Sequence, residues 1–288
     1  MTFLLDEIAL ATARLAEAGV PSPRTDAEEI AAYVHGVRRS ELHNVTDADF
    51  DALFWEGVAR REAREPLQHI TGRAYFRYLS LEVGPGVFVP RPETEVVAGW
   101  AIERLREMDV ASPVVVDLGT GSGAIALSIA QEIALATVHA VEVDPDAYRW
   151  AKRNILEHGQ GRVHLHPEDL ADALSELNGQ VDLVISNPPY IPPGAIPRDP
   201  EVRDYDPHRA LYGSGSDGLD EVRAVERTAR RLLRPGGFVA VEHADEQGTP
   251  VYLIFSEDNG WRDVRSRQDL TRRVALARWW RVAGRGGT

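Results

Sequence analysis

Four consecutive residues offer an unusual set of hydrogen-bond acceptors. Asn187, Pro188, Pro189 and Tyr190 follow the apolar run 181–185. Because proline has no N–H, this stretch of backbone presents carbonyl oxygens only. With the side-chain oxygen of Asn187 they form an array that fits a planar NH2 group, which donates one N–H to Asn187 and one to the carbonyl of Pro188 and stacks on Tyr190. The alternative interpretation is a rigid turn with a buried tyrosine.

Such an array suits transfer of a methyl group to an amide nitrogen. An amide nitrogen is a weak nucleophile because its lone pair is delocalised into the carbonyl. Hydrogen bonds to Asn187 and Pro188 would return electron density to the nitrogen. Stacking on Tyr190 would aim the nitrogen at the methyl group of a donor, in line with the bond between that methyl group and the sulfur that leaves. We therefore expect catalytic roles for these three residues and substrate contacts from all four, Pro189 included.

A glycine-rich loop predicts a nucleoside cofactor. The loop consists of Gly119, Thr120, Gly121, Ser122 and Gly123. It stands between the apolar run 114–118 and the helical run 124–132, so its glycines permit a tight turn and the helix start offers free N–H groups. The next expected strand leads into Glu142, roughly twenty residues past the first glycine, where a carboxylate can accept both hydroxyls of a ribose. A tight turn without a ligand is the alternative.

The spacing of the loop favours S-adenosylmethionine over a dinucleotide. Dinucleotide enzymes prefer G-x-G-x-x-G, in which the helix cradles a pyrophosphate. Here the spacing is G-x-G-x-G, and Asp117 stands two residues before the first glycine. A carboxylate there would repel a pyrophosphate and suit the sulfonium and amine of S-adenosylmethionine. Asp169, which follows the run 163–165, is expected to contact the adenine or to cap a helix.

The elements that position these residues read as an α/β fold. Short apolar runs at 114–118, 138–143, 163–165, 181–185 and 238–241 alternate with helical stretches, which predicts a Rossmann-like parallel sheet with helices on both faces. Residues 1–73 read as a helical domain. Residues 74–90 read as a β-hairpin linker, with its turn at Gly84, Pro85 and Gly86. Residues 91–288 form the expected catalytic domain, in which 261–280 read as two further edge strands and 191–216 as a long functional loop.

Composition narrows the class of protein. The formal net charge of −13 disfavours a general nucleic-acid coat, and the absence of cysteine excludes disulfides and cysteine-ligated metals and fits a reducing cytoplasm. There is no run long enough for a membrane helix and no signal-peptide pattern, so we expect a cytoplasmic protein. The nine histidines show no ligand spacing, so no metal is expected.

The chain resembles the HemK/PrmC family, the protein-(glutamine-N5) methyltransferases that modify peptide-chain release factors. The resemblance lies in the segment 64–72 (REPLQHITG), the segment 88–95 (FVPRPETE), the loop DLGTGSG and the tetrapeptide NPPY. These segments occur in the family's order across nearly the whole chain. The tetrapeptide NPPY alone is shared with DNA adenine methyltransferases and some ribosomal RNA enzymes. The segment PRPETE is what distinguishes the HemK/PrmC family from these enzymes.

The resemblance implies a substrate, a cofactor and site residues. The substrate is the glutamine of the Gly-Gly-Gln loop of release factors, and the helical domain helps to hold that partner. S-adenosylmethionine is converted to S-adenosylhomocysteine. Cofactor contacts fall on 119–123, Glu142 and Asn187, together with Asp169 and Leu170, although some members carry an aromatic residue at Leu170. Asp206 and Ser214 depart from the family's usual glutamate and glycine. We expect a monomer that contacts no nucleic acid directly.

The segment 88–95 is expected to line the site between the domains. Its candidate residues are Phe88, Arg91, Pro92, Glu93 and Thr94. Whether they face cofactor or substrate is open, and Arg91 with Glu93 fits a surface ion pair with a helix cap equally well. Alternatives for the whole chain are a ribosomal-protein glutamine methyltransferase, a DNA or RNA amino-methyltransferase, a silent cofactor-binding module and a nicotinamide oxidoreductase.

Overall fold

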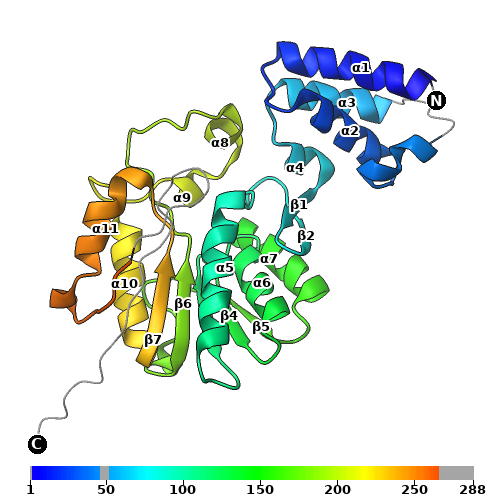
Figure 1. The fold of residues 1–288 in the computed structure, drawn as a ribbon. Coiled ribbons are helices and arrows are strands. Elements are labelled where there is room, and N and C mark those ends of the chain that lie inside the picture. The colour runs from blue at the N-terminus through cyan, green and yellow to red at the C-terminus, as the bar shows by residue number, and fades with distance from the viewer. Residues whose placement is uncertain (1, 46–51, 266–288) are drawn as a thin grey trace, which may run out of the picture. The chain divides into compact units, whose positions relative to one another are not determined.

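The computed structural model describes residues 2–45 and 52–265, which form two compact units (Figure 1). The first unit contains the described residues up to Arg73, with Val83–Pro85 and Ile196–Asp206. The second contains Ala74–Glu82, Gly86–Ala195 and the described residues from Pro207 onward. Part of the loop that sequence analysis assigned to the catalytic region therefore packs with the helical unit.

The first unit is helical, as predicted. Its helices are α1 (Thr2–Glu17), α2 (Pro23–Val34), the 3-10 helix η1 (Arg39–Asn44), α3 (Ala52–Glu62), α4 (Leu67–Thr71) and α8 (Pro200–Tyr205). Apolar residues at helical spacing meet in one core, in which Leu15, Ile30 and Phe54 are fully buried. Gly57 lets α3 approach α2 closely, because a Cβ there would lie 2.8 Å from the Ile30 side chain.

Glu201 attaches α8 to the other helices of this unit. Its Oε1 accepts hydrogen bonds of 2.8 Å from Arg61 and Arg64, and its Oε2 accepts another of 2.8 Å from Arg64. Arg61 is buried and also donates to Asp26 over 2.8 Å. Tyr205 adds a hydrogen bond of 2.9 Å to the carbonyl of Ala63. Charge-assisted bonds of this kind are strong, so α8 is firmly tied to α3.

The expected β-hairpin is present, but its turn lies elsewhere. β1 (Arg73–Phe76) and β2 (Leu79–Glu82) are joined through Arg77, whose φ of 52° is left-handed. The turn expected at 84–86 instead follows the hairpin. No residue type marked the true turn, because arginine rarely adopts positive φ. Here Arg77 is held by a hydrogen bond of 2.6 Å to Glu132.

The second unit contains the predicted parallel sheet. Its strands are β3 (Val114–Leu118), β4 (Thr137–Val141), β5 (Val163–His166), β6 (Val181–Ser186) and β7 (Leu233–Val241), in the order β5-β4-β3-β6-β7. The five strands predicted between residues 114 and 241 are confirmed. β7 begins before the predicted Phe238, because the pairing with β6 shifts between Val181 and Leu183 and accommodates the Pro-Gly-Gly sequence.

Helices cover both faces of this sheet (Figure 1). Its helices are α5 (Pro92–Glu107), α6 (Ala124–Glu132), α7 (Pro145–His158), η2 (Ser175–Leu177), α9 (His208–Leu211), α10 (Asp220–Leu232), η3 (Asp245–Gln247), α11 (Gly248–Ile254) and η4 (Glu257–Asn259). One core joins α5, α6 and the hairpin to one face, and another joins α10 and α11 to the opposite face. The neighbours Val115 and Val116 belong to different cores because side chains alternate along a strand.

The two further strands expected at 261–280 are not seen in the described part of the chain. Residues 261–265 belong to no strand, and 266–280 lie outside the described residues. Trp261 is instead buried in the core beneath α10 and α11, where its indole N–H donates to Glu226 over 2.7 Å. Among the helices of the described residues, none has the length and apolarity needed to cross a membrane.

Candidate functional site

Three strand ends bring the predicted site residues together. Leu118 of β3 pairs with Val141 of β4 on one side and with Ser186 of β6 on the other. The next residues along the chain, Gly119, Glu142 and Asn187, therefore emerge side by side at the carboxyl edge of the sheet. The strand order reverses between β3 and β6, which is where ligands bind in open α/β sheets.

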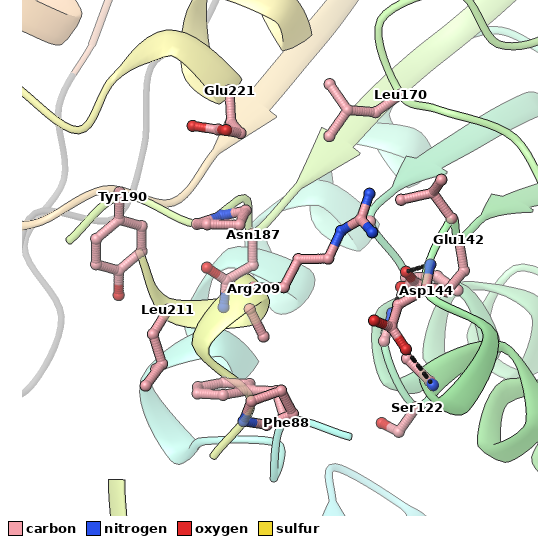
Figure 2. A pocket seen from close by; sticks show the side chains of 18 of the residues that line it. Phe88, Ser122, Glu142, Asp144, Leu170, Asn187, Tyr190, Arg209, Leu211 and Glu221 are labelled. Carbon is pink, nitrogen blue, oxygen red and sulfur yellow. Dashed lines mark hydrogen bonds between the residues drawn. The ribbon is translucent and has the colours of Figure 1, made fainter. Parts of the chain in front are cut away.

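These residues line a cavity of about 410 Å³ within the second unit (Figure 2). Of the predicted cofactor residues, the cavity is lined by Gly119, Thr120, Gly121, Ser122, Glu142, Asp169, Leu170 and Asn187. Of the other predicted residues, it is lined by Phe88, Thr94, Pro189 and Tyr190. Gly123, Pro188, Arg91, Pro92 and Glu93 are not among the lining residues. Arg91 lies over the ring of Phe88, with 5.0 Å between its guanidinium carbon and the ring centroid.

The glycine loop requires its glycines for their backbone conformation. Gly119, Gly121 and Gly123 have φ values of 73°, 57° and 87°, a region that side chains disfavour. A Cβ on Gly119 or Gly121 would meet no atom within 4 Å, so this backbone faces open space. The amides of Gly119 and Thr120 each donate to the carbonyl of Val141 over 2.9 Å, which fixes the loop against β4.

Glu142 connects the glycine loop to the segment after β4. Its Oε2 accepts a hydrogen bond of 2.8 Å from the amide of Gly121, and its Oε1 accepts one of 2.9 Å from the amide of Asp144. Burial raises the pKa of Glu142, while these amides act in the opposite direction. A carboxylate oxygen can accept more than one hydrogen bond, so both oxygens keep the capacity to bind a hydroxyl group.

Asp117 differs from its sequence-based interpretation. It is fully buried and is not among the cavity-lining residues, so it is not placed to face a ligand's positive charge. Its Oδ2 accepts from the hydroxyl of Thr120 over 2.6 Å and from the amide of Ala126 over 3.1 Å. Burial raises its pKa to about 7. Asp117 therefore ties the glycine loop to the start of α6.

Asn187 is oriented by a residue of α5. Its Nδ2 donates a hydrogen bond of 3.2 Å to the hydroxyl of Thr94. The oxygen and nitrogen of an amide point in different directions, so this bond turns Oδ1 away from Thr94 and leaves it available as an acceptor. Figure 2 shows Asn187 beside Tyr190 at one end of the cavity. The tyrosine hydroxyl donates to Glu242 over 3.4 Å.

Gln247 holds the backbone of the tetrapeptide in place through a hydrogen bond, and the sequence analysis did not identify it. Its Nε2 donates to the carbonyl of Tyr190 over 2.7 Å and to that of Asp217 over 3.3 Å. Its Oε1 accepts from the amide of Ala244 over 3.2 Å. Nothing in the local sequence indicates that this buried glutamine holds another segment in place. A nearby glycine, Gly218, is a partial signal of close backbone packing. Gly218 has a φ of 74°, and a Cβ there would lie 2.9 Å from the carbonyl oxygen of Tyr190.

Three histidines form a stack at the β4–β5 edge, away from the cavity lining. Nδ1 of His139 lies 3.1 Å from Nε2 of His166, and the ring centroids of His139 and His164 are 5.3 Å apart. Burial, together with the neighbouring imidazoles, lowers the pKa of His139 to about 4. Within 2–45 and 52–265, no group of three or more histidine and acidic side chains is arranged to hold a metal ion.

Comparisons with known families match both units. Residues 8–72 match the PrmC N-terminal domain, and residues 85–196 match the methyltransferase small domain. A release factor glutamine methyltransferase of Streptomyces coelicolor is 63% identical over 278 residues, which are 96% of this chain and 98% of that protein. Another with the same name, from Mycolicibacterium smegmatis, is 48% identical and aligns with 98% of this chain and 99% of its own.

Two further similarities are to a named enzyme and to a solved structure. A 4-amino-L-phenylalanine/4-methylamino-L-phenylalanine methyltransferase of Streptomyces pristinaespiralis is 40% identical, covering 91% of this chain and 89% of that protein. The solved structure of a methyltransferase from Pyrococcus furiosus superposes with a TM-score of 0.52 at 20% identity, covering 71% of this chain and 90% of that one. The latter similarity concerns the fold alone.

Proposed function

This chain belongs to the family of release factor glutamine methyltransferases, and we propose that it transfers a methyl group from S-adenosylmethionine to the side-chain amide nitrogen of the Gly-Gly-Gln glutamine of a release factor. The observation that carries the proposal is the position of Asn187 at one end of a cavity whose other wall holds Glu142 and the glycine loop. An amide-binding group and a nucleoside-binding group thus share one cavity.

The residues present fit the proposed cofactor. The backbone of Gly119 and Gly121 faces open space, which permits close approach of a ligand. Glu142 lines the cavity with acceptor capacity for the ribose hydroxyls, and we assign adenine contacts to Asp169 and Leu170. Phe88 and Thr94 line the same cavity. When bound, S-adenosylmethionine supplies an electrophilic methyl group on a sulfonium.

The proposed roles of the chain's own residues follow from acceptor geometry. Asn187 Oδ1 and the carbonyl of Pro188 accept the two N–H groups of the glutamine amide, and Tyr190 stacks on the amide plane. These bonds raise electron density on the nitrogen and fix its direction of attack. The nitrogen would gain positive charge as it accepts the methyl group and would then release one of its two protons to water. The acceptors stabilise that charge, so no strong base is required beforehand.

The family and its named relatives support the substrate assignment. Both matched relatives with the release-factor name align over almost their whole length. The relative that is named for an aromatic amine makes 4-amino-L-phenylalanine the second substrate to test. A ribosomal-protein glutamine and a nucleic-acid base, which carry the same kind of nitrogen, are further test substrates. We place the reaction in the cytoplasm, where release factors act.

Mass spectrometry of a purified, unmodified release factor tests the proposal. The factor is incubated with this protein and S-adenosylmethionine, and a factor whose Gly-Gly-Gln glutamine is replaced serves as the control. The expected result is a gain of one methyl mass on that glutamine and no gain in the control. Methylation of 4-amino-L-phenylalanine, a ribosomal protein or a nucleic acid without methylation of the release factor would overturn the substrate assignment and keep the methyltransferase.

A further inference from the structure

The cavity has an uneven charge distribution. Five carboxylates line it, namely Glu142, Asp144, Asp169, Asp220 and Glu221. Among the described residues that line the cavity, Arg209 of α9 is the single arginine or lysine. Neither the sequence motifs nor the proposed catalytic roles use this residue. A ligand that carries more than one positive group and a single negative group would match such a lining.

The side chain of Arg209 extends into the cavity. In Figure 2 its guanidinium lies between Asn187 and Glu142, on the side away from Tyr190. No hydrogen bond or ion pair joins Arg209 to another residue of the described chain. Arg203, which is also exposed, pairs with Asp204 instead. The donors of Arg209 are therefore available to a ligand.

We propose that Arg209 binds the α-carboxylate of S-adenosylmethionine, an inference that rests on the proposed function. The cofactor carries a sulfonium, an α-ammonium and an α-carboxylate. The acidic lining favours the two positive groups and repels the carboxylate, which therefore needs a cation of its own. A guanidinium meets a carboxylate with two parallel hydrogen bonds, which gives both strength and orientation.

The position of Arg209 agrees with this role. Glu142 is assigned to the ribose, and the methyl group must reach the nitrogen held at Asn187. The amino-acid chain branches from the same sulfur as the methyl group and the ribose carbon, so its carboxylate must lie within a few bonds of the groups assigned to these two residues. In Figure 2 the guanidinium of Arg209 lies between Asn187 and Glu142, within reach of a group bound near either one. It is less suited to the substrate amide, whose NH2 group needs acceptors, because arginine has donors only.

Two ligands that differ in the amino-acid end test the proposal by binding. S-adenosylhomocysteine retains the α-carboxylate, whereas 5′-methylthioadenosine keeps the nucleoside and the sulfur but lacks the amino-acid group. Isothermal titration calorimetry compares the wild type with Arg209→Gln and Arg209→Lys. Arg203→Gln is the matched control, because Arg203 is exposed and pairs with its neighbour Asp204 outside the cavity lining.

Arg209→Gln should raise the Kd for S-adenosylhomocysteine by about 10- to 100-fold, the range expected for a charge-assisted hydrogen-bond pair. Its Kd for 5′-methylthioadenosine should stay within about twofold, which also reports that the site is folded. Arg209→Lys should recover part of the loss because it keeps the charge without the planar fork. The Arg203 control should bind both ligands as the wild type does.

Other outcomes contradict the assignment. An equal loss of affinity for both ligands would mean that Arg209 acts on the nucleoside or on the fold. Unchanged affinity for both would mean that the carboxylate is bound elsewhere. If the wild type methylates its substrate and Arg209→Gln binds S-adenosylhomocysteine normally, only this inference fails. If the wild type binds neither ligand, the proposed cofactor fails with it.

Discussion

The side-chain nitrogen of Asn187 donates a hydrogen bond of 3.2 Å to the hydroxyl of Thr94, which lies 93 residues earlier in the chain. Thr94 is buried near the start of α5. The bond fixes the direction in which the oxygen of the Asn187 amide points, and that oxygen is the proposed acceptor of a substrate N–H. The start of α5 thus sets the orientation of a group at the end of β6.

Thr94→Val should therefore lower kcat for release-factor methylation by about tenfold, equivalent to about 1.4 kcal/mol, since valine keeps the shape and removes the hydroxyl. The melting temperature should fall only slightly, because one hydrogen bond contributes about 1 kcal/mol. Thr94→Ser, which keeps the hydroxyl, is the control and should retain most of the turnover. Steady-state kinetics make the comparison, and equal turnover in valine and serine variants would contradict the role.

Gln247→Glu should weaken catalysis by disturbing the tetrapeptide backbone. The change replaces an NH2 donor by an oxygen opposite the carbonyls of Tyr190 and Asp217, which are acceptors themselves. We expect kcat to fall by about tenfold or more, while affinity for S-adenosylhomocysteine changes by less than about threefold. Gln180→Glu is the control, because Gln180 is exposed and donates to the carbonyl of Glu176. Parallel loss of cofactor affinity would indicate general misfolding instead.

Asp117 should make the stability of the protein depend on pH. Burial raises its pKa from 3.8 to about 7 in the folded state, so the folded protein binds the proton more tightly than the unfolded chain does. The stabilisation is fully present below pH 3.8 and is lost as the pH rises through about 7. Asp117→Asn removes this titration and can still accept the two hydrogen bonds.

Thermal unfolding between pH 5 and pH 8 compares the two proteins. The melting temperature of the wild type should decline relative to that of Asp117→Asn as the pH rises, because only the wild type must ionise the carboxyl at position 117. Asp146→Asn is the control, since Asp146 lies at the start of α7 and pairs with Arg149 at the surface. Parallel curves for wild type and Asp117→Asn would contradict the raised pKa.

Glu201→Gln should loosen α8 within the helical unit. The substitution removes the negative charge that Arg61 and Arg64 share, although Arg61 keeps Asp26. We expect a loss of about 1–3 kcal/mol in local stability, because Arg61 keeps Asp26 whereas Arg64 loses its carboxylate partner. Hydrogen exchange of residues 196–206 should quicken, whereas Asp204→Asn, an exposed change in the same helix, should leave the rate nearly unchanged. Equal exchange rates in the two variants would contradict this role of Glu201.

Local patterns were sufficient to predict most of the fold and the core of the cavity. The strand at 114–118 and the helix at 124–132 occur as predicted, because apolar periodicity and glycines act over short distances. The contacts of Thr94 and Gln247 with the tetrapeptide join distant segments, and no local rule reveals them. Asp117 was misread because spacing tells which residues adjoin a loop but not which way a side chain points.

The course of the chain between its two units has a consequence for recombination. The chain passes from one unit to the other after Arg73, Glu82, Pro85, Ala195 and Asp206. A chimaera made by joining the first 73 residues of one homologue to the remainder of another would separate Arg61 and Arg64 from their own Glu201. The first 73 residues and the segment 196–206 must therefore be exchanged together. The sequences of these two regions are expected to have diverged as a coupled pair.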